Sequence, residues 1–271
     1  MTDTIAKLGV IGGGVMGEAL LSRLIEQHIY QPTEVIVSEP QLQRRETLAQ
    51  QYTINVTDQN SQAASATEVL LLAIKPQIFH QVATELSAVK IPENTLILSI
   101  LAGVPLAQLE AAFPGQPVVR VMPNTPALVG AGMSAIAAGE QVQPHHRQQA
   151  KQILNAVGEV VEVPERLMDA VTGLSGSGPG YVAIIIEALA DGGVAAGLPR
   201  AIASQLALQT VLGTAQLLQQ SGMHPAELKD RVTSPGGTTI AGVAQLEQAG
   251  LRSALIQAVQ AASQRSEELG S

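Results

Sequence analysis

The feature that most constrains the fold is a glycine-rich turn near the start of the chain, directly after an apolar run. Gly12, Gly14 and Gly17 have the spacing G-x-G-x-x-G, between an expected strand at residues 7–11 and an expected helix at 16–26. In this context the spacing is typical of a dinucleotide site. Gly12 permits the tight turn, Gly14 lets the backbone approach a pyrophosphate, and Gly17 allows the helix to pack closely on the strand.

Short apolar runs alternate with helical patterns through the first half of the chain. This alternation predicts βαβ units and a parallel sheet. The expected strands are residues 7–11, 34–38, 69–73, 95–99 and 118–122, and a pair at 133–137 and 159–163 is expected to extend the sheet. The expected helices are residues 16–26, 41–50, 77–87, 105–113 and 145–157. We therefore assign residues 1–163 to an α/β, Rossmann-like dinucleotide-binding domain.

After Pro164 the strand patterns stop, and residues 164–271 are expected to form an all-helical domain. Pro179 and Pro199 suit the first turns of two of its helices. Residues 181–196 are apolar nearly all round, which indicates a helix buried on most sides. A domain of this size cannot cover such a helix alone, so we expect an obligate dimer formed through the helical half.

Composition excludes several classes of function. The 271 residues include 23 acidic and 15 basic side chains, so the chain does not attract nucleic acid or an anionic membrane. Aromatic residues make up 2% and cysteine is absent, which removes base-stacking platforms, thiolate nucleophiles and Cys-type zinc sites; no metal is expected. The longest unbroken apolar runs are too short to span a bilayer, and no signal peptide is recognised. We expect a cytoplasmic protein.

A second candidate site lies near the other end of the chain, where two glycines and several hydroxyls precede an apolar-periodic helix. Its residues are Ser234, Gly236, Gly237, Thr238 and Thr239. Bare backbone N–H groups, the positive end of a helix and hydroxyl donors together suit a small carboxylate. The same residues also occur in an ordinary Pro-Gly turn followed by a threonine cap.

With both ends considered, the chain resembles the pyrroline-5-carboxylate reductase family, whose members reduce the cyclic imine 1-pyrroline-5-carboxylate to proline with NAD(P)H. The resemblance runs from residue 5 to about 269. Gly180 departs from the usual family residue before the tyrosine at 181. The segments that carry the resemblance are IGGGVMG at 11–17, AIKP at 73–76, AGV at 102–104, VMPNTPA at 121–127, SGSGP at 175–179 and the specific signature at 228–246.

The resemblance implies roles for particular residues. The substrate carboxylate is expected on Ser234, Gly236, Gly237 and Thr238, and the hydroxyl of Thr239 is expected to contact the ring nitrogen as the catalytic group. The cofactor is expected to contact Ile11, Gly12, Gly14, Val15, Met16, Gly17, Glu39, Asn60, Ala73, Lys75, Pro76, Ala102 and Asn124. Lys75 is alternatively a solvated turn residue, and Asn124 is alternatively an Asx-turn residue.

The expected chemistry requires no strong general acid, because an imine nitrogen is basic enough to arrive protonated. Accordingly, no histidine lies in a matching motif: His28, His80, His145 and His146 are expected to be structural or solvated, and His224 is expected to cap a helix. Catalysis is expected to come from holding the nicotinamide against the imine carbon.

The cofactor is NADPH or NADH. Glu39, at the end of the second strand, is typical of sites that bind the ribose 2′-OH of NAD. Arg44 and Arg45 lie near enough in sequence to neutralise a 2′-phosphate, and the resemblance slightly favours NADPH.

Two other classes remain as alternatives. A β-hydroxyacid-type dehydrogenase or related imine reductase shares the order of domains, but the dehydrogenases use a lysine on the first long helix after the sheet, which this chain lacks. A non-enzymatic nucleotide-binding regulator would be favoured only if the segment 234–239 were broken, and it is intact.

Overall fold

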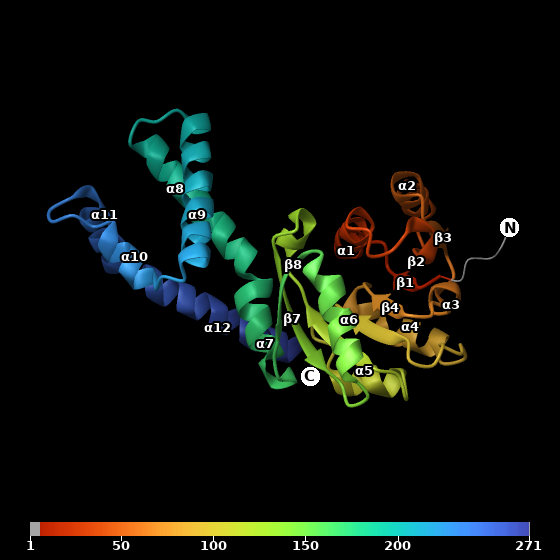
Figure 1. The fold of residues 1–271 in the computed structure, drawn as a ribbon. Coiled ribbons are helices and arrows are strands. Elements are labelled where there is room, and N and C mark those ends of the chain that lie inside the picture. Colours follow the sequence, from red (N-terminus) through yellow and green to blue (C-terminus); the bar gives the residue numbers. More distant parts are fainter. Residues whose placement is uncertain (1–5, 271) are drawn as a thin grey trace. The chain divides into compact units, whose positions relative to one another are not determined.

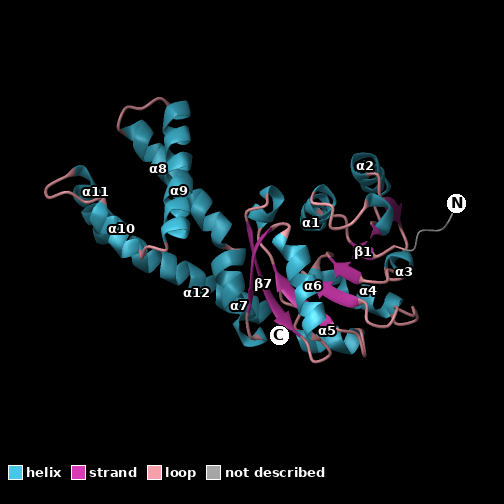
Figure 2. Ribbon diagram, viewed as in Figure 1, coloured by secondary structure: helices cyan, strands magenta, loops and turns pink. Residues whose placement is uncertain are grey.

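The computed structural model describes residues 6–270 and contains one eight-stranded sheet in the order β3-β2-β1-β4-β5-β6-β7-β8 (Figures 1 and 2). Strands β1 to β6 pair in parallel, β7 runs antiparallel to β6, and β8 is parallel to β7. The strands are β1 (Leu8–Ile11), β2 (Val35–Ser38), β3 (Asn55–Thr57), β4 (Val69–Leu72), β5 (Leu96–Ser99), β6 (Val118–Met122), β7 (Gly132–Ala138) and β8 (Gly158–Glu162).

Two hydrophobic cores lie on opposite faces of this sheet, because successive side chains of a strand point to opposite sides. In β4, Val69 and Leu71 belong to one core, and Leu70 and Leu72 belong to the other. The first core is covered by α1 (Val15–Glu26), α2 (Leu42–Tyr52) and α6 (Pro144–Asn155). The second is covered by α3 (Asn60–Ala63), α4 (Phe79–Leu86), α5 (Leu106–Ala112) and α7 (Met168–Val171). Burial on both faces explains why these strands read as continuous apolar runs.

Short helical turns connect several of these elements. Four of them are 3₁₀ turns: η1 (Pro32–Glu34), η2 (Pro76–Ile78), η3 (Thr125–Val129) and η4 (Glu165–Leu167). A π-helical segment, η5 (Thr172–Gly176), follows α7. The π turn lies in the stretch that the sequence assigns simply to helix.

The remaining helices are α8 (Gly178–Ala195), α9 (Arg200–Ser221), α10 (Pro225–Arg231), α11 (Thr238–Gln248) and α12 (Leu251–Gly270). Within this group α8 and α9 pack side by side, and their close approach uses Gly193, where an added Cβ would lie 3.1 Å from the Cβ of Ala203. The Tyr181 hydroxyl donates to the Ala258 carbonyl oxygen at 3.3 Å, which joins α8 to α12. Many large apolar side chains of α8 and α9 are nevertheless exposed.

By length and composition α9 could cross a membrane, and it is the one such helix among residues 6–270. No long unbroken apolar run marks this helix in the sequence. Its polar residues, such as Gln205 and Thr210, are distributed among leucines and alanines.

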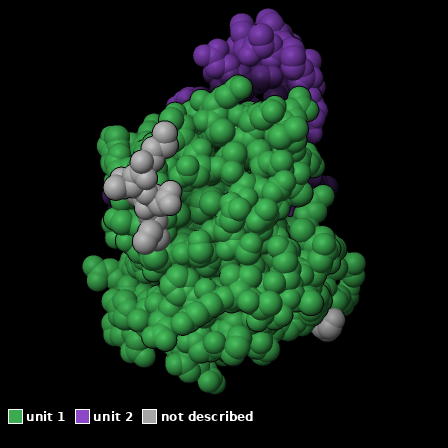
Figure 3. Space-filling model, turned by 90° about the vertical axis from the view of Figure 1, so that its right-hand side faces the viewer, with its two compact units in different colours: residues 1–176, 262–271 green, residues 177–261 purple. Residues whose placement is uncertain are grey.

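The chain divides into two compact units, which Figure 3 distinguishes by colour. Unit 1 contains residues 1–176 and 262–271, and unit 2 contains residues 177–261. Residues 164–176 and the last ten residues, which the sequence analysis assigned to the helical domain, therefore belong to unit 1. The end of α12 is fixed there by a hydrogen bond of 2.6 Å from the Ser266 hydroxyl to the Asp169 carboxylate.

Candidate active site

The residues expected to contact a dinucleotide follow the carboxyl ends of parallel strands in unit 1. Strands β1, β2, β4 and β5 end at Ile11, Ser38, Leu72 and Ser99. The order of strands reverses between β1 and β4, which lie side by side although two strands separate them in sequence. In open α/β sheets, ligands bind outside the carboxyl ends of the strands at such a point.

The glycine-rich turn between β1 and α1 has the geometry that its spacing predicts. Gly12 has φ +102°, and an added Cβ there would lie 2.6 Å from the carbonyl oxygen of Ala73. An added Cβ on Gly17 would collide with the carbonyl oxygen of Gly12, so a larger residue would separate the helix from the turn. Gly14, the residue before α1, is exposed, and no atom lies within 4 Å of a Cβ added there. The backbone at this position is therefore open to the approach of a ligand.

Helix α1 presents its amino end at this turn. Its first residue, Val15, is exposed, and Met16 is partly buried against the first core. The first N–H groups of a helix lack intrahelical partners, so this end can bind a phosphate.

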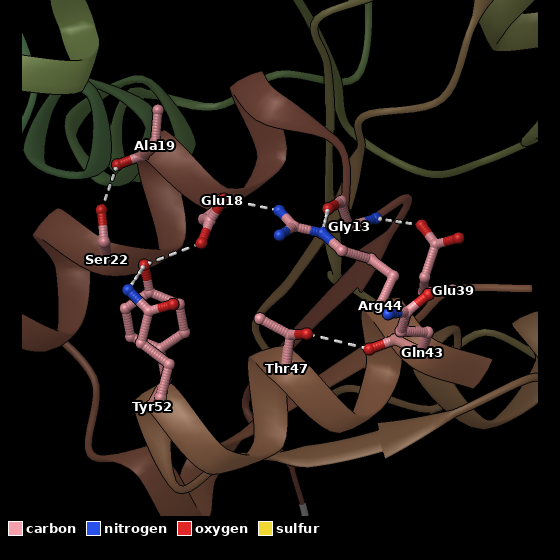
Figure 4. A network of polar contacts seen from close by, with 10 residues as sticks. Gly13, Glu18, Ala19, Ser22, Glu39, Gln43, Arg44, Thr47 and Tyr52 are labelled. Carbon is pink, nitrogen blue, oxygen red and sulfur yellow. Dashed lines mark hydrogen bonds and ion pairs between the residues drawn. The ribbon is translucent and has the colours of Figure 1, made fainter. Parts of the chain in front are cut away.

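Glu39 follows β2 and is bonded directly to the glycine-rich turn. Its Oε2 accepts a hydrogen bond from the Gly13 N–H at 3.0 Å, and its Oε1 accepts one from the Gln41 N–H at 3.0 Å. Figure 4 shows the carboxylate directed at Gly13. The sequence analysis placed Glu39 at the correct edge of the sheet, but it gave no sign of the contact with Gly13.

Asn60, at the start of α3, lies beside the end of β2. Its Oδ1 accepts from the Ser38 hydroxyl at 2.7 Å, and its Nδ2 donates to the Glu85 carboxylate at 2.7 Å. Ser38 was not among the residues expected at the site, although its position as the last residue of β2 could have indicated it.

The loops after β4 and β5 contain the next group of expected cofactor contacts. Ala73 donates its N–H to the Ile11 carbonyl oxygen at 2.8 Å, which holds the start of its loop beside β1. Lys75 is exposed and immediately precedes Pro76, the first residue of η2. Ala102 is exposed and precedes Gly103, which has φ +77°.

The Asn124 side chain connects three segments of unit 1. Its Nδ2 donates to the Ser175 carbonyl oxygen at 3.1 Å, and its Oδ1 accepts from the Met133 N–H at 2.8 Å. These contacts fix the loop after β6 against β7 and against the π segment η5. The bond to the Met133 N–H is not that of a simple Asx turn, and a contact of Asn124 with the cofactor stays a prediction.

The candidate carboxylate site forms a turn followed by a helix within unit 2. The Gly237 N–H donates to the Ser234 carbonyl oxygen at 3.0 Å, and Gly236 has φ +65°. A proline before a residue with positive φ is typical of a type II turn, which here is residues 234–237. Thr238 and Thr239 are the first two residues of α11, so their N–H groups lie at its positive end.

Three hydroxyls at this turn have no partner in the part of the chain that the structure describes: those of Ser234, Thr238 and Thr239. Ser234 and Thr238 are exposed, and Thr239 is half-buried. Hydroxyl groups that can both donate and accept, beside free N–H groups, suit a small anion with a polar ring.

The histidines occupy structural or exposed positions. His224 caps α10, since its Nδ1 accepts the Ala226 N–H at 3.2 Å. His80 is exposed on α4. His145 and His146 lie in the first turn of α6, which corresponds to the helix expected at residues 145–157; His145 is exposed and His146 is buried. Among residues 6–270 no group of three or more His, Asp or Glu side chains is placed to hold a metal ion.

Comparisons with known proteins agree with both halves of this description. The family model "Pyrroline-5-carboxylate reductase dimerisation" matches residues 165–269, and "NADP oxidoreductase coenzyme F420-dependent" matches residues 7–103. A pyrroline-5-carboxylate reductase from Synechocystis sp. is 60% identical over 97% of this chain and 98% of its own length. The chain belongs to the pyrroline-5-carboxylate reductase family. This membership assigns it to the NAD(P)H-dependent oxidoreductases and identifies the helical half as a dimerisation domain.

Solved structures of the family have the same fold. The reductase from Coxiella burnetii has a TM-score of 0.90 at 34% identity, and covers 99% of this chain and 100% of its own. A reductase from Plasmodium falciparum, solved with NADP bound, has a TM-score of 0.86 at 32% identity, with 100% of both chains covered. A 3-hydroxyisobutyrate dehydrogenase shares only the fold, at 14% identity and a TM-score of 0.53, so the dehydrogenase alternative has no support beyond the fold.

Proposed function

We propose that this protein reduces 1-pyrroline-5-carboxylate to L-proline with NAD(P)H, the last step of proline biosynthesis. The 60% identity to a reductase of that name over nearly the whole chain carries the proposal. The turn at 234–237, with free hydroxyls beside the start of α11, is a binding element suited to the small carboxylate of this substrate.

Substrate binding is assigned to the turn and the first residues of α11. The carboxylate accepts hydrogen bonds from the backbone and hydroxyls of Ser234, Gly236, Gly237 and Thr238. The Thr239 hydroxyl accepts a hydrogen bond from the protonated imine nitrogen, and the same contact continues to the amine of proline. Thr239 therefore orients the C=N bond and stabilises charge on its nitrogen without transferring a proton.

When bound, NAD(P)H supplies the hydride that adds to the imine carbon, while the electron pair of the C=N bond goes to the nitrogen. Cofactor binding is assigned to the carboxyl edge of the sheet in unit 1. The turn residues Gly12, Gly14 and Gly17, with Ile11, Val15 and Met16, hold the pyrophosphate and its surroundings. Glu39 and Asn60 belong to the adenosine side, and Ala73, Lys75, Pro76 and Ala102 line the loops nearer the nicotinamide; Asn124 positions its loop.

We assign the active assembly to dimers formed through the helical domain, which combine into a higher oligomer, and we place the enzyme in the cytoplasm. The exposed apolar side chains of α8 and α9 support a partner on this domain. The chain's formal net charge of −8 supports the absence of nucleic-acid and membrane partners.

The test is an absorbance assay of NADH and NADPH oxidation with two substrates. We expect oxidation with pyrroline-5-carboxylate and L-proline as the product, and at most slow oxidation with an open-chain keto acid. Efficient reduction of the keto acid without turnover of the cyclic imine would instead indicate a dehydrogenase of the β-hydroxyacid type. Tight cofactor binding without turnover of either substrate would favour a regulator.

A further inference from the structure

We propose that Glu39 makes this enzyme prefer NADH over NADPH, and that the two arginines beside it do not offset the preference. The inference rests on the proposed function, because it concerns the cofactor of that reaction, and it reverses the slight preference for NADPH that the family resemblance implies. In Rossmann folds an acidic residue after the second strand binds the ribose 2′-OH of NAD, whereas a nearby arginine accommodates the 2′-phosphate of NADP. Both residue types are present here, so the contacts of Glu39, Arg44 and Arg45 decide which cofactor is preferred.

The Glu39 carboxylate is held at the cofactor-binding edge by the backbone. The residue is 8% exposed, and its two oxygens each accept a backbone N–H, from Gly13 and from Gln41, at 3.0 Å. Gly13 stands between Gly12 and Gly14, so the carboxylate is joined to the turn that carries the pyrophosphate. Within residues 6–270 no lysine, arginine or histidine forms an ion pair with Glu39.

Arg44 is occupied by the turn and by a carboxylate on α1. Its Nε donates to the Gly13 carbonyl oxygen at 2.8 Å, and one of its terminal nitrogens lies 2.5 Å from the Glu18 carboxylate. Glu18 also accepts the Tyr52 hydroxyl at 3.0 Å, so two side chains of α2 bind the same carboxylate of α1 (Figure 4). The positive charge of Arg44 is therefore already neutralised by Glu18.

The Arg45 guanidinium is also occupied. One terminal nitrogen donates to the carbonyl oxygens of Glu39 and Pro40, at 2.7 and 2.9 Å. The other lies 3.5 Å from the Asp58 carboxylate, and the side chain is only 15% exposed. Arg45 thus holds the backbone after β2 in place and is paired with a carboxylate of its own.

The balance of charge opposes a 2′-phosphate. Three carboxylates, of Glu18, Glu39 and Asp58, accompany two guanidinium groups, of Arg44 and Arg45, so the cluster carries one formal negative charge. A phosphate monoester would add about −1.5 to −2 charges next to the unpaired Glu39. A ribose 2′-OH can instead donate to the remaining lone pairs of the same carboxylate.

A purely structural role for Glu39, stabilising the turn through Gly13, is separable from a role in cofactor choice. Glu39→Gln keeps the length of the side chain and one carbonyl oxygen that can accept the Gly13 N–H, but it removes the charge. Glu46→Gln is a matched control, because Glu46 is exposed on α2, the helix that follows Glu39, and it forms no hydrogen bond or ion pair with the described residues of the turn.

The experiment measures kcat/KM for NADH and for NADPH on the full-length enzyme with saturating pyrroline-5-carboxylate. Dissociation constants for both cofactors are measured in parallel by nicotinamide fluorescence without substrate. We expect the unmodified enzyme to favour NADH by about tenfold or more, and Glu39→Gln to move both ratios toward NADPH by about tenfold. Glu46→Gln should leave both ratios unchanged.

A preference for NADPH in the unmodified enzyme, or unmoved ratios in Glu39→Gln that still binds NADH, would overturn the inference. If neither cofactor supports turnover of the imine but both bind, the proposed function fails while the ratio of dissociation constants still decides the role of Glu39. The two failures are therefore distinguishable.

Discussion

At the scale of single residues, Gly12 and Gly14 of the dinucleotide turn differ in their surroundings. Alanine at each position is therefore expected to affect stability and cofactor affinity to different extents. Gly12→Ala places a Cβ 2.6 Å from the Ala73 carbonyl oxygen at a φ of +102°. We expect it to lower the free energy of unfolding by about 1–3 kcal/mol. Gly14→Ala meets nothing within 4 Å, so its cost is limited to a poorer helix cap, about 1 kcal/mol or less.

The effect of Gly14→Ala on cofactor affinity should be larger than its effect on stability. Gly14→Ala is expected to weaken NADH binding at least about tenfold although the fold is retained, because its methyl group occupies the approach of the pyrophosphate. Urea unfolding and fluorescence titration with NADH measure the two quantities. Unchanged NADH affinity in a stable Gly14→Ala protein would show that the pyrophosphate does not bind against Gly14.

The hydroxyl of Thr239 predicts an effect on turnover more than on cofactor binding. Thr239→Ala removes the group assigned to the imine nitrogen, and we expect kcat to fall about tenfold to a hundredfold, with NAD(P)H affinity unchanged. Thr239→Ser retains the hydroxyl and should recover most of the activity. Steady-state kinetics with pyrroline-5-carboxylate check both variants; equal kcat in Thr239→Ala and the unmodified enzyme would reject the assigned role.

At the scale of elements, α6 contains a buried histidine that makes stability depend on pH. His146 is 3% exposed, and its Nδ1 accepts the Gln143 N–H at 3.1 Å. Burial and the neighbouring His145 lower the pKa of His146. The folded state therefore binds fewer protons than the unfolded state as the pH falls. The contribution of neutral His146 to the free energy of unfolding is complete above about pH 6.5 and is lost as the pH falls through the folded-state pKa.

The matching prediction compares two variants. His146→Asn keeps an acceptor for Gln143 but does not titrate, so its stability should fall less than that of the unmodified protein between about pH 7.5 and about pH 5.5. His80→Asn, at an exposed position on α4, should retain the full pH dependence. Urea unfolding at both pH values measures the difference, and the same loss in all three proteins would contradict the assignment to His146.

Local sequence predicted those elements that bury continuous apolar runs or carry glycine and proline signals. β1, β2, β4, β5 and β6 were therefore expected, as was the paired extension by β7 and β8. β3 and α3 were missed because they are short, and β3 has a single buried residue, Thr57. The antiparallel direction of β7 was not available from periodicity, which does not encode strand direction.

Side-chain partners were the part of the candidate site that sequence could not supply. The positions of Glu39 and of the segment 234–239 followed from spacing alone. The occupation of Arg44 by Glu18, across two helices, depends on how α1 and α2 pack on the sheet. Sequence alone therefore left the choice between NADH and NADPH open, and the contacts of Arg44 and Arg45 favour NADH.

At the scale of the whole molecule, the helical unit leaves apolar surface that the chain itself does not cover. Its exposed large side chains include Ile184 and Leu189 on α8 and Ile202, Leu206, Leu208 and Leu212 on α9. Large apolar side chains exposed in such number are typical of a protein interface, and the match of residues 165–269 to a dimerisation domain supports a second copy of the chain as the partner. The same apolar surface explains why α9 has the composition of a membrane-spanning helix.

This interface predicts that a single charge on α9 disrupts assembly. Leu206 is 53% exposed within one chain, and Leu206→Glu would bury an unpaired carboxylate between two copies, which costs several kcal/mol. We expect sedimentation velocity to show a dimer or larger oligomer for the unmodified protein and a shift toward monomer for Leu206→Glu. Leu42→Glu is the control, because Leu42 is 62% exposed on α2, outside the matched dimerisation region. An unmodified protein that stays monomeric, or assembly that tolerates Leu206→Glu as well as Leu42→Glu, would show that this face of α9 is not the interface.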